Sequence, residues 1–230
     1  MSAVRSLLLL AALAIAPAAA DAESRLFLAG GEVADAAYYG YAGLVLPLPG
    51  RADGRGFLQR YWVDRFGYEY DGGVGRVKAN ALGAEAALGY GSSSAQGWVT
   101  GWIGLRYTDT SLSPDDREAS ARGSQLGAKL QFEAERSVAE AWRAGAIGSW
   151  SNEQDAYWGR VRLMRAVSPT KSLGAEFVAN GNDEADSTAA GLVLVLRPAG
   201  NRWSVGLKAG YRFQDDADGA YGGIELGYGF

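Results

Sequence analysis

Two segments of the chain place tryptophan and arginine at even spacings along the sequence. They are Trp98, Trp102 and Arg106 in one segment, and Trp158, Arg160 and Arg162 in the other. Residues an even number of positions apart lie on the same face of an extended strand. Indole rings offer apolar faces to sugar rings, and guanidinium groups donate hydrogen bonds to hydroxyls and carboxylates. We therefore treat these six side chains as candidate contacts for a glycan.

The chain contains no histidine and no cysteine, and these absences exclude several kinds of catalysis and metal binding. Without histidine there is no Ser-His-Asp catalysis and no imidazole ligand for a metal. Without cysteine there is no thiol catalysis, no Cys/His zinc site and no disulfide. The sequence predicts a protein that is not an enzyme and that binds no metal or cofactor.

The elements that carry the candidate residues are strands, as the C-terminus shows most clearly. Ile224, Leu226, Tyr228 and Phe230 alternate with glycine and with Glu225. This pattern gives a strand one apolar face for lipid, and such alternation through most of the chain is typical of an outer-membrane β-barrel. The four apolar residues are also expected to act as a C-terminal insertion signal for the barrel-assembly machinery.

The charged residues are expected to face the lumen, because a charge on the lipid face costs about 2–4 kcal/mol at the bilayer midplane. This rule gives a positive excess of seven basic to four acidic lumen residues. With three tryptophans, the candidate lumen or glycan-contacting residues are Trp98, Trp102, Arg106, Lys129, Arg143, Trp158, Arg160, Arg162, Lys208, Arg212, Glu85, Glu133, Glu176 and Glu225. Segments 57–68 and 192–196 give no clear alternation, so their faces stay unassigned.

Two interpretations of this charged lumen stay open. In a small barrel, arginine and glutamate side chains can interlock and plug the bore. Alternatively, they can line a narrow passage or a binding track for sugars.

The N-terminus has the form of a secretory signal peptide. Arg5 precedes the apolar run 7–16, and small residues follow at Ala18 and Ala20. We predict cleavage after Ala20, with Ala22 as an alternative, so that residues 1–20 are the signal peptide and 21–230 the barrel. The apolar run is too short for a transmembrane helix, which disfavours a retained anchor.

Alternation and turn residues together predict twelve strands. Their ranges are 24–33, 37–47, 56–69, 76–91, 96–108, 122–134, 141–151, 156–166, 172–181, 187–197, 202–213 and 220–230. An even count returns both ends of the barrel to the periplasmic side, where we place the turns at 47–50, 92–94, 168–169 and 198–201. The acidic connections at 71–73, 109–121, 152–155, 182–186 and 214–219 then face outward from the cell.

Aromatic spacing supports a membrane barrel over the alternative of a soluble β-sandwich. Trp142 and Trp150 are eight residues apart on one strand face, as are Trp203 and Tyr211. At about 3.3 Å per residue this matches two aromatic girdles around an apolar band. The expected location is the outer membrane of a Gram-negative cell, with membrane lipid and lipopolysaccharide as partners. A net charge of −4 gives no indication of nucleic-acid binding.

Several short segments, taken in their order along the sequence, resemble those of a known family. They are Tyr38–Gly43, Trp62–Arg65, Gly67–Asp71, Leu112–Asp116, Arg122–Ser124, Gly174–Glu176 and Gly210–Arg212. In their order and spacing they resemble the cellulose biosynthesis protein BcsS family, small outer-membrane β-barrels of alphaproteobacteria. The resemblance implies a role in making or exporting bacterial cellulose, an exopolysaccharide. It implies cellulose synthase or export components, or glucan, as partners, and it supplies no catalytic residues.

The function expected from the sequence is therefore non-enzymatic support of cellulose biosynthesis or export. The alternative is a small outer-membrane channel for anionic oligosaccharides or other small solutes, based on the predicted positive lumen.

Overall fold

The computed structural model describes residues 25–51, 54–183, 185–200, 202–214 and 218–230, and within these the chain is all-β with no helix. Its twelve strands are β1 (Leu26–Ala34), β2 (Ala37–Pro47), β3 (Arg55–Gly72), β4 (Gly75–Ser94), β5 (Gly97–Ser113), β6 (Gly123–Ala139), β7 (Trp142–Ser151), β8 (Ala156–Ser168), β9 (Lys171–Gly181), β10 (Asp186–Leu196), β11 (Trp203–Gln214) and β12 (Gly219–Gly229). In the described ranges, no helix has the length and apolar character needed to cross a bilayer. The predicted signal peptide, residues 1–20, lies outside the described residues.

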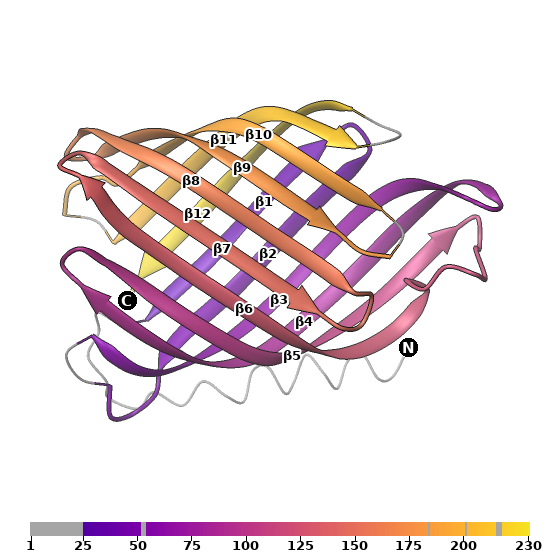
Figure 1. Ribbon diagram of the computed structural model, residues 1–230, viewed down its shortest axis with the longest axis horizontal. Coiled ribbons are helices and arrows are strands. Elements are labelled where there is room, and N and C mark those ends of the chain that lie inside the picture. Colours follow the sequence, from indigo (N-terminus) through magenta and orange to yellow (C-terminus); the bar gives the residue numbers. More distant parts are fainter. Residues whose placement is uncertain (1–24, 52–53, 184, 201, 215–217) are drawn as a thin grey trace.

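The strands form one closed antiparallel barrel (Figure 1). Each strand pairs with its neighbours in sequence, and β1 pairs with β12 from Leu26 opposite Gly229 to Ala34 opposite Tyr221. The predicted closed barrel of twelve strands is confirmed. Because the strand count is even, β1 begins and β12 ends at the same end of the barrel, which we call the terminus end. We call the opposite end the loop end.

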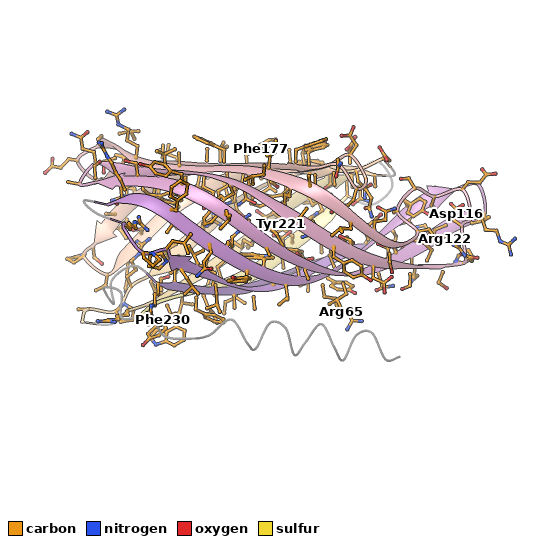
Figure 2. The ribbon with its side chains drawn as sticks, turned by 90° about the horizontal axis from the view of Figure 1, so that it is seen from below. Arg65, Asp116, Arg122, Phe177, Tyr221 and Phe230 are labelled. Carbon is orange, nitrogen blue, oxygen red and sulfur yellow. The ribbon has the colours of Figure 1, made fainter. Side chains whose placement is uncertain are left out.

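Alternation separates an apolar outer surface from a mostly polar interior. Large hydrophobic side chains such as Leu82, Ile103 and Leu126 are more than half exposed on the outside. Figure 2 shows Phe177 on this outer surface, whereas Tyr221, four positions before Glu225 on the same face, is buried inside. This is the pattern of a barrel whose outside meets an apolar medium.

The predicted aromatic pairs are both on the outer surface. Trp142, Trp150, Trp203 and Tyr211 are all more than a third exposed. At the terminus end, Trp203 stacks on Tyr228 with 4.5 Å between ring centroids, and Tyr228 stacks on Phe230 at 5.9 Å. Amphipathic rings of this kind favour the level where apolar and aqueous surroundings meet.

Strands β3 to β6 are longer than the sequence predicted, with 18, 20, 17 and 17 residues. Their hairpins extend past the other strands at the loop end (Figure 1), and Figure 2 shows Asp116 and Arg122 at the tip of this extension. The predicted turn at 92–94 is wrong, because it lies wholly within β4 at the terminus end. The predicted connections 71–73 and 109–121 are wrong in part, because 71–72 belong to β3 and 109–113 to β5. The prediction relied on apolar residues to mark strand faces, whereas these stretches continue the strands with mostly polar residues.

Glycines allow bulky side chains to lie flat against the inner wall. Gly89 is opposite Trp102, and Gly43 is opposite Trp62. A Cβ atom at either glycine would overlap the indole ring of its partner. These two glycines therefore have a packing role inside the barrel.

Candidate functional site: the barrel interior

The strand register places all fourteen candidate side chains on the interior face of the barrel. It also assigns the two segments that the sequence left open. In β3, Arg60, Trp62 and Asp64 face inward. In β10, Val193 faces inward and is 1% exposed, so part of the inner wall is apolar.

The first ion-pair network lines the wall formed by β3 to β6. Arg60 binds Glu85 through its Nε at 2.9 Å and Glu133 through its Nη1 at 2.8 Å, and its guanidinium lies 4.7 Å from the ring centroid of Trp102. Lys129 binds the second oxygen of Glu85 at 2.7 Å. The first network has two groups of ion pairs on this wall: Arg60, Glu85, Lys129 and Glu133 form one, and Asp64, Arg106 and Glu153 form the other.

Arg106 forms the other half of this first network. Its two terminal nitrogens bind the two oxygens of Asp64 at 2.8 and 2.9 Å, and its Nε lies 3.2 Å from Glu153. Such a bidentate pair fixes the orientation of both side chains. Glu153 follows β7 in a connection at the loop end, so this pair ties a loop to the wall.

The second ion-pair network lines the opposite wall, from β8 through β12 to β1. Arg162 bridges Glu176 at 2.6 Å and Glu225 at 2.7 Å, and Arg160 also binds Glu225, at 2.9 Å. Lys208 binds Glu32 at 2.6 Å. The full network consists of Glu32, Arg160, Arg162, Glu176, Lys208, Arg212 and Glu225.

The predicted excess of positive charge in the lumen is wrong. The two networks, with the separate pair of Arg143 and Glu135 at 2.8 Å, contain eight basic and eight acidic side chains. The sequence missed one base, Arg60, and four acids, which are Glu32, Asp64, Glu135 and Glu153. Arg60 and Asp64 lie in the segment whose faces were unassigned, and Glu153 had been placed in a loop.

Several of these ion pairs cross the bore and do not simply follow the wall. Arg60 and Glu133 lie on β3 and β6, three strands apart, and the partners Arg162 and Glu225 lie on β8 and β12, four strands apart. Network side chains are only 0% to 19% exposed. A twelve-stranded barrel encloses more space than an eight-stranded one, and here the network side chains project into that space and are buried there.

The loop end of the bore is closed by contacts between strands that face one another. The amide of Asn182, just after β9, donates to the hydroxyl of Tyr68 on β3 at 3.1 Å, and these strands lie six positions apart in a ring of twelve. Gln214 on β11 donates to the backbone carbonyl of Glu69 at 3.1 Å. We call these residues, together with the connection 114–122, the cap.

The connection between β5 and β6 packs into the cap. Ala119 is buried in a cluster with Tyr70 and Val77, and the hydroxyl of Tyr70 donates to Asp116 at 3.3 Å. Ser120 donates to Asp183 in the connection after β9 at 3.2 Å. The cap therefore joins loops from opposite sides of the barrel.

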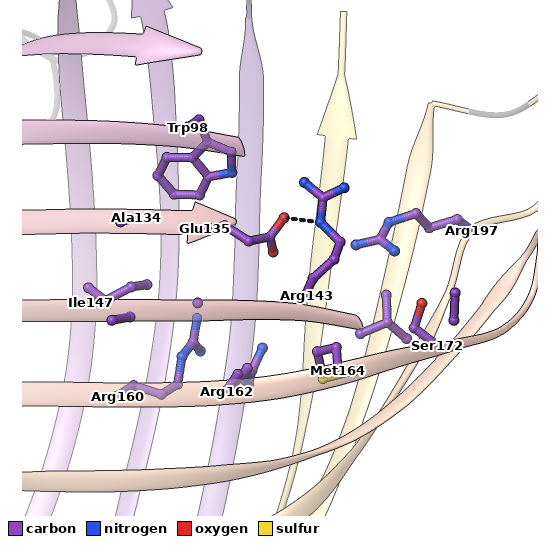
Figure 3. Close-up of a pocket in the computed structure, with 14 residues that line it drawn as sticks. Trp98, Ala134, Glu135, Arg143, Ile147, Arg160, Arg162, Met164, Ser172 and Arg197 are labelled. Atoms are coloured by element: carbon purple, nitrogen blue, oxygen red, sulfur yellow. Dashed lines mark hydrogen bonds and ion pairs between the residues drawn. The ribbon is translucent and has the colours of Figure 1, made fainter. Parts of the chain in front are cut away.

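The terminus end, by contrast, contains a cavity of about 130 Å³ (Figure 3). Four of the candidate residues meet here, namely Trp98, Arg143, Arg160 and Arg162. Further lining residues that the sequence did not single out are Glu135, Ile147, Met164, Ser172 and Arg197. In this cavity a predicted aromatic residue and three predicted arginines face open space together.

The other predicted tryptophans have different surroundings. Trp102 is 6% exposed beneath Arg60, and its indole nitrogen has no hydrogen-bond partner in the described structure. Trp158 lies under Arg160, with 5.6 Å between the guanidinium carbon and the ring centroid. Trp98, in comparison, is 37% exposed at the cavity.

Glu153 is the carboxylate with the least complete set of partners. Its Oε2 is buried and has no hydrogen-bond partner in the described structure, while Oε1 accepts from Thr108 at 3.4 Å. Burial raises the pKa of Glu153, and the nearby Arg106 opposes this shift. In the described ranges, no group of three or more histidine, cysteine, aspartate or glutamate residues is arranged to hold a metal ion.

Comparison with known proteins gives one family match and many matches of fold. The family model described as cellulose biosynthesis protein BcsS matches residues 26–230. No curated protein matches the chain significantly.

Solved structures with a similar fold are outer-membrane barrels. An outer membrane channel from Pseudomonas putida F1 is 13% identical with a TM-score of 0.60, covering 94% of this chain and 100% of its own. The translocator domain of the autotransporter NalP from Neisseria meningitidis is 12% identical with a TM-score of 0.53, covering 99% and 95%. The KdgM porin in complex with disordered oligogalacturonate is 10% identical with a TM-score of 0.50, covering 89% and 99%. At these identities the similarity concerns the fold alone.

Proposed function

Because the chain belongs to the BcsS family of cellulose biosynthesis proteins, we propose that it supports cellulose synthesis or export as a non-enzymatic barrel in the outer membrane. The family match spans the whole barrel, and this observation carries the proposal. The location is supported by the apolar outer surface, the aromatic residues at both ends of the strands and the outer-membrane barrels that share the fold. Because the strand count is even, both ends of the barrel chain lie at the terminus end, which faces the periplasm in bacterial outer-membrane barrels.

The proposed support is structural and does not rest on conduction of the polymer. Ion pairs cross the bore at mid-height, and the cap joins opposite loops at the loop end. A glucan chain would have to displace both sets of contacts to pass through. We therefore place the working surface at the terminus end, where glucan or periplasmic synthesis and export components can reach the barrel.

Within the interior, the accessible part of the proposed glycan site is the cavity with Trp98. Trp102 and Arg106 are held in the first network, and Arg162 is already bound to two carboxylates, Glu176 and Glu225. Trp98 keeps an exposed ring at the cavity that Arg160 also lines. Aromatic stacking on sugar rings uses such a face.

The experiment is to delete the gene and measure extracellular cellulose, with outer-membrane integrity checked in parallel. We expect cellulose to fall while the envelope stays intact, and wild-type protein to restore it. Trp98→Ala tests the terminus-end site, and Trp142→Ala is its matched control, because both rings are 37% exposed at the same end but Trp142 faces outward.

Two results would count against the proposal. Unchanged cellulose in the deletion strain would remove the role in cellulose production. Equal restoration by wild type and Trp98→Ala, at equal amounts of protein in the membrane, would remove Trp98 from the glycan site and leave the wider role standing.

A second function is favoured by one observation, the similarity of fold to porins and channels. In this alternative the barrel passes small solutes and is gated by the cap. The interior ion pairs contain equal numbers of basic and acidic residues, eight of each, which argues against a strong anion preference along the bore. Conductance across planar bilayers tests this function, and a non-conducting barrel would contradict it.

A further inference from the structure

The terminus-end cavity contains more positive charge than its surroundings balance. Arg143 uses its Nε to bind Glu135 at 2.8 Å, and its two terminal nitrogens have no hydrogen-bond partner among the described residues. Figure 3 shows its guanidinium next to that of Arg197. Among the described residues, no ion pair is found for Arg197. Two guanidinium groups therefore meet at one cavity, whose lining includes a single carboxylate, that of Glu135 on the far side of Arg143 from Arg197.

The wall behind the cavity does not cancel this charge. Arg160 and Arg162 line the cavity and belong to the second network, which has four basic and three acidic members. Arg162 is fully engaged with Glu176 and Glu225, but only one terminal nitrogen of Arg160 is bound, to Glu225 at 2.9 Å. The Oγ of Ser172 adds a neutral donor at the same cavity.

We propose that this cavity binds an oxyanion, the phosphate or carboxylate group of a small anionic sugar, between Arg143 and Arg197. Guanidinium groups recognise both anions through paired hydrogen bonds. A volume of about 130 Å³ has room for the anionic group, since a single water needs only about 10–15 Å³ on the same measure. The ring would extend past Trp98, whose exposed face it can cover.

This site differs from a neutral glucan track in the chemistry it requires. A neutral sugar offers hydroxyls, which do not offset two adjacent positive charges. An oxyanion does so and gains charge-assisted hydrogen bonds. The proposal does not depend on the role in cellulose production, because it concerns binding to the purified barrel.

The test is calorimetric titration of the purified, detergent-solubilised protein with inorganic phosphate, glucose 6-phosphate, glucuronate and glucose. We expect the three anions to bind, glucose not to bind, and affinity to fall with increasing salt. Arg143→Gln and Arg197→Gln should each weaken anion binding by about tenfold, because each removes a charged hydrogen-bond donor. Arg136→Gln is the matched control, since it removes an exposed arginine on the outer face near the same end.

The arms of the titration also identify the source of the anion. Glucose 6-phosphate binding more tightly than phosphate supports an anionic sugar that uses Trp98, and Trp98→Ala should then remove the difference. Equal affinities would overturn the sugar part of the proposal. Absence of anion binding in the millimolar range, or identical binding by Arg136→Gln, Arg143→Gln and Arg197→Gln, would overturn the site itself.

Discussion

Asp64 and Glu153 face the same guanidinium, that of Arg106, but their surroundings differ. Both oxygens of Asp64 accept from Arg106, and its side chain is 1% exposed. Glu153 uses one oxygen and leaves the other buried without a partner in the described structure. The two carboxylates therefore contribute differently to stability although both form an ion pair with the same residue.

The first prediction concerns Asp64. Asp64→Asn should destabilise the barrel by about 3–5 kcal/mol, because it leaves the buried Arg106 without its main counter-charge. Urea unfolding of the protein refolded in lipid vesicles measures this change. Arg76→Gln, at an exposed ion pair with Glu69, is the control and should cost less than about 1 kcal/mol. Equal losses in the two variants would contradict a dominant role for the buried pair.

The second prediction is a pH dependence that belongs to Glu153. Its pKa is raised in the folded protein, so the folded state holds the proton more tightly than the unfolded state does. Ionised Glu153 therefore lowers stability at pH values above its folded pKa, and this penalty disappears as the pH falls. Glu153→Gln should be at least as stable as wild type at neutral pH, with the difference vanishing below about pH 4.

Unfolding curves of both proteins across this pH range provide the measurement. A Glu153→Gln variant that loses stability at neutral pH, and regains it in acid, would show that the ion pair with Arg106 outweighs burial.

At the residue scale, the sequence could predict which side chains face inward but not which ones meet. The inward placement of Arg160, Arg162 and Glu225 follows from alternation on strands with a clear apolar face. Their pairing depends on the register and on the distance across the bore, which no local pattern encodes. Asp64 was missed because β3 carries both an aromatic and a charged residue on each face.

Among the elements, β4 and β5 show how a glycine on one strand accommodates a ring on the next. Trp102 lies over Gly89, and Arg60 covers the ring from the other side. The indole is thereby held between a strand backbone and a guanidinium group. This packing links the first network to the wall.

The third prediction tests this contact. Gly89→Ala should destabilise the barrel by about 1–3 kcal/mol, because the new methyl group overlaps the Trp102 ring in a well-packed interior. Gly101→Ala on β5 is the control, since a Cβ there meets no atom within 4 Å. The free energy of unfolding in urea, and the temperature at which the folded band on a gel shifts to the unfolded position, are measured for both variants. A loss in Gly101→Ala equal to that in Gly89→Ala would point to backbone effects of glycine replacement instead of overlap.

The elements themselves were largely predictable. All twelve strands were located, since alternation and turn residues are local signals. Their ends were not, because β3 and β5 continue at the loop end and β4 and β6 continue at the terminus end with mostly polar residues. The cap was not predictable at all, as it joins Tyr68 to Asn182, which are 114 positions apart in the sequence.

Considered as a whole, the molecule is a barrel with a filled middle, a closed loop end and a small cavity at the terminus end. The fourth prediction follows from this shape. The wild-type protein should show little or no conductance in planar bilayers, and removal of residues 115–121 together with Asn182→Ala should raise conductance only modestly, because the crossing ion pairs remain.

Adding Asp64→Asn or Glu225→Gln to the shortened variant should raise conductance further, since these changes release arginines from the bore. Val74→Ser, in the exposed β3 to β4 hairpin, is the control and should leave conductance unchanged. A large conductance in the wild-type protein would show that the bore opens in the membrane and would favour the channel function.

The ion pairs of the second network also determine the order in which the molecule can assemble. Glu32 on β1 finds its partners, Lys208 and Arg212, on β11, and Glu225 on β12 binds arginines of β8. The charge of Glu32 on β1 therefore has no counter-charge until β11 has been synthesised and placed beside β12. A half-built sheet would expose these charges to the bilayer, so insertion hairpin by hairpin is disfavoured. Closure is expected to be a single concerted event, and a chain ending before β11 should have no stable membrane-inserted form.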